Sequence, residues 1–234
     1  MARNRPTSAN SYRHAAAYFR RRISGWFPTH RRTFPWRETT DPYAVLMAEM
    51  MLRRTRAAQV VPVYSRFLRQ FPTVEVLARS PGDLVATTLR PLGLVWRLPA
   101  FQQIAAELVA RFGGRVPRDR GQLLTLTGVG DYVADAVRCF AFGDSVAIVD
   151  TNTVRVAGRY FGFEFGPESR RQRDVIDAVA RLLAKRAPKD SNMALLDFAA
   201  TICTAVRPGC EICPVARACA WRTTRDLKQE EPAF

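Results

Sequence analysis

The sequence predicts an all-α protein, and three observations support this. Apolar residues recur at helical spacing in one segment after another. No segment alternates between apolar and polar residues for long, and there is no internal repeat. Hydrophobic residues make up 47% of the 234-residue chain, which is long enough for one large or two small helical domains. The longest apolar runs fall far short of a membrane span, so we expect a soluble protein.

Helices are predicted throughout the N-terminal half. The first covers about Tyr12 to Trp26, followed by a turn at Phe27-Pro28. Asp41 and Pro42 predict a helix start, because Asp is a favoured N-cap and Pro suits the first turn, and this helix should run to about Arg56. Further helices, with nearby prolines as breaks, are expected at Val60–Phe71, Val74–Arg79, Gly82–Leu89 and Ala100–Phe112.

A glycine-rich turn opens the C-terminal half. Gly128 and Gly130 flank Val129, so the backbone can adopt positive φ and nothing blocks an approaching group. Apolar residues at helical spacing over 131–142 place this turn at a helix N-terminus, which is an anion site. An ordinary helix–turn–helix is the commoner explanation of such a triplet alone. Later helices are expected at Thr151–Phe161, Arg173–Arg186 and from Asn192 into Cys203.

The charge of the chain points to a polyanionic partner. Thirty-six Lys and Arg against 21 Asp and Glu give a net charge of +15, which favours nucleic acid over a membrane surface. The segment 1–37 holds nine Arg and no acidic residue. It is either a DNA-facing basic arm or an organellar transit peptide, and its packing aromatics favour the arm.

Glu49 is predicted to lie on an apolar helix stripe. Val45, Leu46 and Leu52 share that face by spacing, so the carboxylate should be desolvated and its pKa raised. The alternative is a Glu at the edge of the stripe that pairs with Arg53.

Four of the five cysteines gather near the C-terminus with C-x6-C-x2-C-x5-C spacing, at Cys203, Cys210, Cys213 and Cys219. A metal site is favoured over two disulfides, because no signal peptide precedes the chain and the C-x2-C pair suits a bridge poorly. One short pair with wider spans favours a [4Fe–4S] cluster over structural zinc. Cys139, on an apolar helix, is expected to be a packed thiol.

Together, Gly128-Val129-Gly130, Asp150 and the cysteine spacing resemble the endonuclease III and MutY superfamily of helix-hairpin-helix DNA glycosylases. The resemblance implies two helical domains that flank a DNA cleft. A six-helix domain with the helix-hairpin-helix would cover 34–146, and a discontinuous [4Fe–4S] cluster domain would combine 1–33 with 147–234.

The resemblance also implies catalytic roles. Asp150 matches the catalytic aspartate, and its alternative role, the N-cap of the following helix, is compatible with catalysis. Tyr132 stands where bifunctional members carry a lysine, and tyrosine cannot form an imine, so water should be the nucleophile. Glu49 falls where MutY-type enzymes place the acid that protonates the departing adenine.

Contacts with DNA follow from the same resemblance. The hairpin at Gly128 should present the amides of Val129, Gly130 and Asp131 to a phosphate, helped by a monovalent cation on hairpin carbonyls. Family members insert wedges at positions that match Arg54, Leu94 and Val95, and Arg207 would touch the backbone. The target base must leave the stack to be reached.

Tyrosine at position 132 resembles the mismatch thymine glycosylases, so the expected substrate is thymine or uracil opposite guanine in double-stranded DNA. Adenine opposite guanine or 8-oxoguanine is the alternative, although the MutY domain that reads 8-oxoguanine is not expected here. A non-catalytic iron–sulfur DNA-binding module is an alternative of another class. We expect a monomer in a bacterial or archaeal cytoplasm that has no membrane partner.

Overall fold

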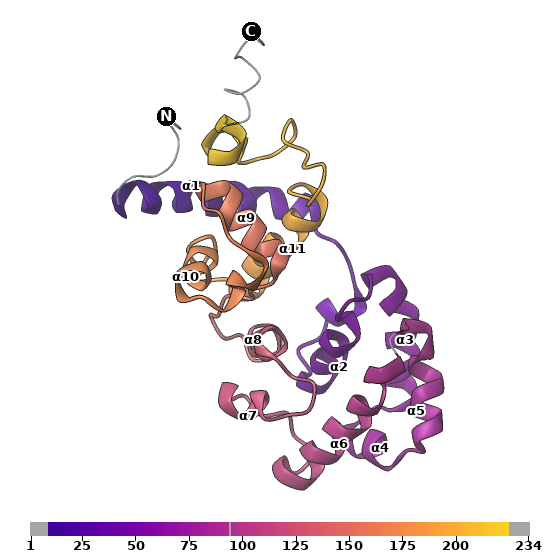
Figure 1. Ribbon diagram of the computed structural model, residues 1–234. Helices are drawn as coiled ribbons and strands as arrows, with labels where there is room; N and C mark the ends of the chain where they lie inside the picture. The colour runs from indigo at the N-terminus through magenta and orange to yellow at the C-terminus, as the bar shows by residue number, and fades with distance from the viewer. Residues whose placement is uncertain (1–8, 94, 225–234) are drawn as a thin grey trace. The chain divides into compact units, whose positions relative to one another are not determined.

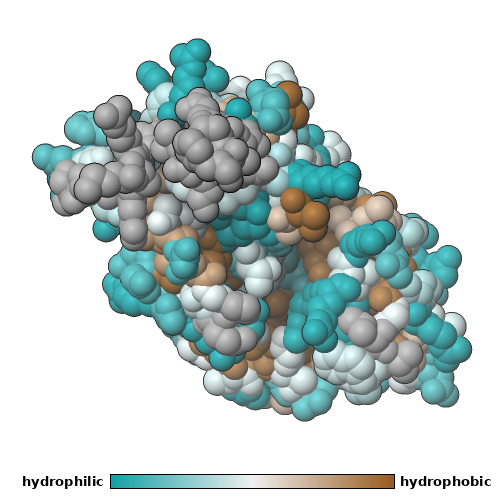
Figure 2. Space-filling view, turned by 45° about the horizontal axis from the view of Figure 1, so that its top comes forward, coloured by the Kyte–Doolittle hydropathy of each residue, from teal (hydrophilic) through white to brown (hydrophobic). Residues whose placement is uncertain are grey.

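The computed structural model describes residues 9–93 and 95–224 of the chain. Within these ranges the secondary structure consists of α-helices and short 3-10 helices without strands, so the all-α prediction is confirmed (Figure 1). None of the helices described there is long and apolar enough to cross a membrane. Hydrophilic side chains dominate the visible face, and apolar ones are scattered over it (Figure 2).

The chain divides into two compact units. One is the continuous stretch Thr33–Asp144, and the other combines the residues up to Arg32 with those from Ser145 onward. Each unit is described by itself below.

The continuous unit is built around α2 (Pro42–Leu52), which is packed against α3 and α8. All nine residues from Tyr43 to Met51 are buried, as expected for a helix that is apolar on every side. Asp41 caps α2, accepting from the Tyr43 and Ala44 amides. Its other α-helices are α3 (Ala57–Gln70), α4 (Val74–Arg79), α5 (Gly82–Leu89), α6 (Pro99–Phe112), α7 (Arg120–Leu124) and α8 (Asp131–Phe140).

The discontinuous unit packs the N-terminal helix against helices from the C-terminal third of the chain. The Phe19 ring makes edge contacts with Tyr160 and Phe198 at centroid distances of 4.8 and 5.8 Å. Fully buried Asp197 accepts from the Arg32 Nε at 2.5 Å. Its α-helices are α1 (Ala9–His30), α9 (Thr151–Phe161), α10 (Arg173–Arg181) and α11 (Pro188–Thr201).

Several predicted boundaries were wrong for identifiable reasons. Helix α1 continues through Pro28 to His30, because a proline near a helix end removes a single hydrogen bond while Trp26 and Phe27 are buried. Helix α2 ends at Leu52, not at Arg56, and Arg53 is already extended. Pro62 lies inside α3 and does not break it.

Candidate functional site

The glycine-rich turn is a tight hairpin between α7 and α8, and its two glycines have different roles. Gly128 has φ +78°, and a Cβ there would lie 2.8 Å from the Met50 Cε, so both the backbone and the space require glycine. Gly130 has φ −109°, an extended conformation open to any residue, and a Cβ there would meet nothing within 4 Å. The expectation that both glycines supply positive φ was therefore wrong, and Gly130 instead leaves open space.

Two side chains from other helices fasten the hairpin. The Glu107 carboxylate on α6 accepts from the Thr127 amide at 2.8 Å and from its hydroxyl at 2.5 Å. Burial raises the pKa of Glu107, but the hydrogen bonds from Thr127 outweigh it and leave that pKa below its ordinary value. The Arg53 guanidinium donates to the Gly128 carbonyl at 2.7 Å. The turn is thus held from both sides by charged groups.

The hairpin delivers the chain to an uncapped helix N-terminus. Gly130 is the N-cap of α8 and has no side chain that could accept from the first-turn amides. The Val129 amide already donates to the Leu126 carbonyl at 3.1 Å, so Val129 drops out of the expected set of phosphate donors. Of the three amides expected to bind a phosphate, those of Gly130 and Asp131 remain candidates.

An ion-pair network lies beside these donors. Arg120 binds Asp131 at 2.7 Å and Asp135 at 3.0 Å, and Arg138 links Asp135 to Asp144. Desolvation of Asp135 raises its pKa despite these arginines. A carboxylate, that of Asp131, therefore lies at the first residue of α8 and is paired with Arg120.

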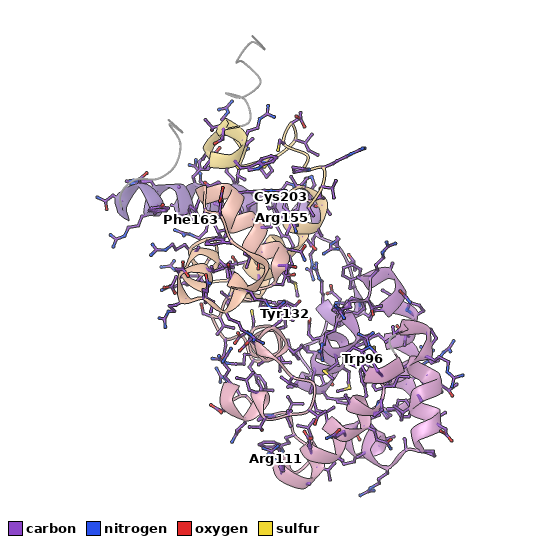
Figure 3. The ribbon with its side chains drawn as sticks, viewed as in Figure 1. Trp96, Arg111, Tyr132, Arg155, Phe163 and Cys203 are labelled. Atoms are coloured by element: carbon purple, nitrogen blue, oxygen red, sulfur yellow. The ribbon has the colours of Figure 1, made fainter. Side chains whose placement is uncertain are left out.

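Glu49 and Tyr132 lie on α2 and α8, two helices that pack against each other. Glu49 is 3% exposed, so its carboxylate is desolvated as the sequence predicted. Tyr132 is half-buried in the first turn of α8 (Figure 3).

Asp150 belongs to the discontinuous unit and is the N-cap of α9. One carboxylate oxygen accepts from the amides of Asn152 and Thr153 at 2.9 and 2.7 Å, and the other accepts from the Asn152 side chain at 2.8 Å. The Thr153 hydroxyl accepts in return from the Asp150 amide, which completes a capping box. The carboxylate is therefore held in a fixed orientation while half-buried.

Hydrogen bonds continue from Asp150 to the cysteine segment. The Asn152 side-chain oxygen accepts from Arg155 at 2.8 Å, and Arg155 donates to the Cys203 carbonyl at 3.0 Å (Figure 3). One turn on, Arg159 donates to the Cys203 sulfur at 3.6 Å and packs over the Trp221 ring at 4.8 Å. Helix α9 thus connects its N-cap carboxylate with the first cysteine.

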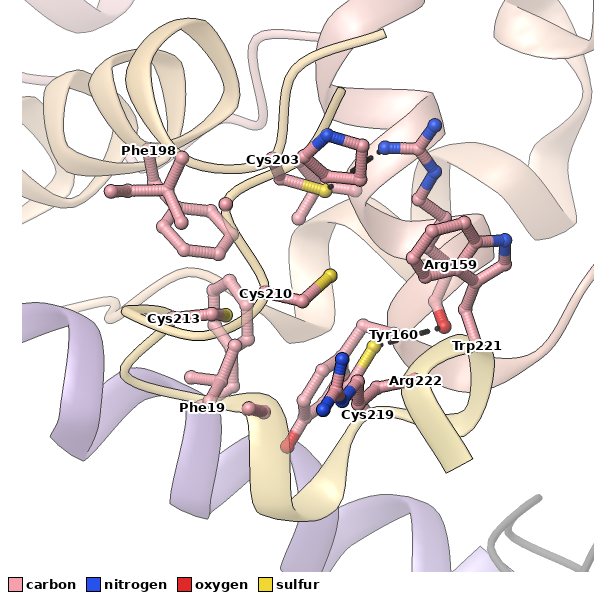
Figure 4. Close-up of a pocket in the computed structure, with 16 residues that line it drawn as sticks. Phe19, Arg159, Tyr160, Phe198, Cys203, Cys210, Cys213, Cys219, Trp221 and Arg222 are labelled. Carbon is pink, nitrogen blue, oxygen red and sulfur yellow. Dashed lines mark hydrogen bonds between the residues drawn. The ribbon is translucent and has the colours of Figure 1, made fainter. Parts of the chain in front are cut away.

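The four clustered cysteines line one pocket (Figure 4). Phe19, Tyr160 and Phe198 form part of its wall. No group of three or more His, Cys, Asp or Glu side chains in the described ranges forms a ready-made site for a metal ion. Burial raises the pKa of Cys213 to about 12 and that of Cys219 to about 11. Cys139, by contrast, is buried on α8, in the other unit.

The structure describes the side chains of some, but not all, of the residues expected to contact DNA as wedges or at its backbone. Arg54 is exposed and is the described non-glycine residue with positive φ, at +58°. Leu94 lies outside the described residues, and the description of Val95 does not extend to its side chain. Arg207 is exposed in the first cysteine loop. Glu107, Asn152 and Arg155 were not predicted from the sequence, because their partners are set by the fold. Arg53 was considered only as a partner of Glu49, whereas it donates to the Gly128 carbonyl.

A family model of HhH-GPD superfamily base excision DNA repair proteins matches residues 47–185, more than half of the chain. The chain belongs to this family. The resemblance predicted from the sequence is confirmed, and the matched range includes the hairpin, Glu49 and Asp150.

Relatives within the family are DNA glycosylases. The chain is 36% identical to a thymine/uracil-DNA glycosylase of Methanothermobacter thermautotrophicus, over 85% of this chain and 90% of the relative. It is 37% identical to an adenine DNA glycosylase of Mycolicibacterium smegmatis, over 86% and 68%. Among solved structures, a thermostable thymine-DNA glycosylase superposes with a TM-score of 0.83 at 34% identity, covering 90% of this chain and 98% of that one.

Proposed function

We propose that this HhH-GPD protein is a monofunctional DNA glycosylase that hydrolyses the N-glycosidic bond of thymine or uracil opposite guanine. The observation that carries the proposal is the Asp150 carboxylate, which three hydrogen bonds hold at the N-cap of α9. Thymine/uracil glycosylases that match nearly the whole chain at 36 and 38% identity support the choice of base. Adenine glycosylases at similar identity keep adenine as the alternative.

Breaking the bond between C1′ and the base leaves positive charge on the sugar. Asp150 supplies a fixed negative charge for that transition state and accepts a proton from the water whose oxygen bonds to C1′. The bonding electrons leave with the base, and Glu49, desolvated on α2, protonates the departing base. The target base is extruded from the duplex before this step.

Tyr132 makes the reaction monofunctional, because a phenol cannot form the imine through which lysine-bearing relatives cut the strand. The product is then an intact abasic site. Borohydride should trap little enzyme on DNA. Tyr132→Lys should create trapping, provided that its half-buried position on α8 lowers the pKa of the new amine. Efficient trapping by the unchanged protein would refute this assignment.

The four cysteines of the discontinuous unit fit a [4Fe–4S] cluster, which makes this unit the cluster domain. Their side chains line one largely apolar pocket, and Arg159 donates to the Cys203 sulfur. A bound cluster would cross-link the segment 203–219 and supply a redox-active group. The raised pKa values of Cys213 and Cys219 imply that binding iron releases protons. About four irons per chain are expected, and one zinc instead would overturn the assignment.

DNA is held mainly through its backbone. The amides of Gly130 and Asp131 bind one phosphate, and exposed Arg54 and Arg207 add cationic contacts. With a net charge of +15, affinity should fall steeply with salt. The protein acts on this duplex as a monomer.

A panel of duplexes that carry G:T, G:U, A:G and A:8-oxoguanine pairs tests the proposal. Alkali after incubation converts abasic sites to strand breaks. Release confined to G:T and G:U supports it, release from the adenine pairs alone favours the alternative, and release from none contradicts both. Asp150→Asn is the matched negative control.

A further inference from the structure

Trp96 is unusual among the tryptophans of the chain. Trp26 and Trp36 are buried, and Trp221 packs under the Arg159 guanidinium, whereas the Trp96 side chain is 67% exposed (Figure 3). An indole is costly to expose, because it carries a large apolar surface. Its position on the short 3-10 helix η3 (Val95–Arg97) therefore calls for a partner outside the described chain.

Arg97, the residue after Trp96, is buried at a cost in free energy. It is 5% exposed and donates to the Arg53 carbonyl, the Met51 carbonyl and the Thr55 hydroxyl. Within the described ranges its Nε has no hydrogen-bond partner. Burying a guanidinium against neutral acceptors is unfavourable, so this anchor is not explained by stability.

The turn that Arg97 grips is strained as well. Arg54 is exposed and has φ +58°. It lies between Arg53 and Thr55, which both accept hydrogen bonds from Arg97. Backbone strain in a residue with a Cβ concentrates at functional sites. Two neighbouring loops thus hold a buried charge, a strained arginine and an exposed indole together.

Arg53 ties these loops to the glycine-rich hairpin. Its carbonyl accepts from Arg97, and its guanidinium donates to the Gly128 carbonyl at 2.7 Å. Gln59 fixes the start of the same loop by donating to the Pro91 carbonyl at 2.6 Å. The contacts of Arg97 and Arg53 therefore position Trp96 relative to the hairpin, which binds a phosphate under the proposed function.

We propose that Trp96 is a base-stacking residue whose exposed indole packs on a nucleobase that loses its stacking partner when the target base is extruded. The inference rests on the proposed function. An aromatic face suits any base, and the exposed Arg54, Arg53 and Arg56 nearby supply cations for the adjoining phosphates. Anchoring the loop in advance avoids the ordering cost of closing it on DNA.

Binding to a duplex with a stable tetrahydrofuran abasic site opposite guanine tests the proposal without catalysis. Trp96→Ala should bind this duplex about tenfold more weakly than the unchanged protein, and Trp96→Phe should retain most of the affinity. Leu84→Ala is the matched control, because Leu84 is an exposed apolar residue of the same unit on α5. Its affinity should be unchanged, as should the melting temperature of every variant.

A 2-aminopurine placed opposite the abasic site, or on either side of it, identifies the base. At one position its emission should be lower with the unchanged protein than with Trp96→Ala, and that position tells which strand supplies the base. Equal affinity and equal emission for the two proteins would overturn the proposal. Failure of the proposed function is separate, because it appears as absent base release from the G:T and G:U duplexes.

Discussion

The helices α8 and α9 begin in opposite ways. The N-terminus of α8 follows Gly130, which has no side chain to cap it. The N-terminus of α9 is closed by its own anion, because Asp150 accepts from the first-turn amides and from Asn152. Both ends use the same backbone donors and helix dipole. Under the proposed function, the open end of α8 binds a phosphate of DNA, whereas the closed end of α9 holds a carboxylate that faces the positive charge of the transition state.

Replacing Asp150 by Asn should give the largest effect. Base release should fall by at least about a hundredfold, because the negative charge opposite the transition state is lost. Asn is a comparable N-cap, so the melting temperature and the DNA affinity should change little. Single-turnover base release and thermal unfolding measure both.

Asp150→Ala completes that comparison. It removes the cap as well as the charge and should cost about 1 kcal/mol of stability more than the Asn variant. If the Asn variant retained rapid base release, the closed end of α9 would be a structural cap alone.

Substitutions at the two hairpin glycines should affect different properties, one the stability of the fold and the other the affinity for DNA. Gly128→Ala should destabilise the protein by about 1–2 kcal/mol, because of its φ of +78° and the Met50 contact. Gly130→Ala should leave stability almost unchanged, since its backbone is extended and its Cβ meets nothing. The added methyl group should nevertheless obstruct the phosphate.

Titration of binding against salt measures this loss. For Gly130→Ala the affinity should fall and the slope of log affinity against log salt should flatten by about 0.9 for a lost phosphate contact. An unaltered affinity and slope would show that the open amides of α8 do not bind DNA.

The contrast also shows what sequence could predict. The capping of α2 by Asp41 and the start of α9 at Thr151 follow from neighbouring residues, and both were predicted correctly. The cysteine spacing predicts a metal site and the family resemblance assigns Asp150, and both assignments stay predictions. Patterns of this kind carry their information within a few residues.

Features that depend on distant residues were missed. Helix α2 ends at Leu52 where Arg97, 44 residues beyond Arg53, grips the turn. The Val129 amide is used inside the hairpin, and Gly128 is held by Arg53 from 75 residues away. Periodicity has no access to such contacts, because they arise only when the helices pack.

Asp131 offers a smaller test of the open end. Its half-exposed carboxylate at the start of α8 interacts favourably with the helix dipole but repels a phosphate. Arg120 neutralises this charge only in part. Asp131→Asn should therefore strengthen DNA binding slightly at low salt while lowering stability by a few tenths of a kcal/mol. Asp135→Asn, which removes the other Arg120 partner one turn further into α8, should lower stability without strengthening binding. Weaker binding by the Asp131 variant would contradict this account.

The acid sensitivity of the hairpin is the smallest expected effect. Burial raises the pKa of Glu107, but the Thr127 hydrogen bonds leave it below the ordinary value. A carboxyl whose pKa is lowered by folding stabilises the native state above its unfolded pKa and loses that contribution as pH falls through the folded value. The hairpin should therefore loosen in acid, as the pH falls below the range in which an ordinary Glu side chain titrates. Glu107→Gln, which keeps one acceptor oxygen, should remove this pH dependence.

Because the Arg118–Asp144 pair weakens in acid in both proteins, the difference between their unfolding curves isolates Glu107. Parallel curves from pH 7 to pH 3 would mean that Glu107 does not couple the hairpin to α6.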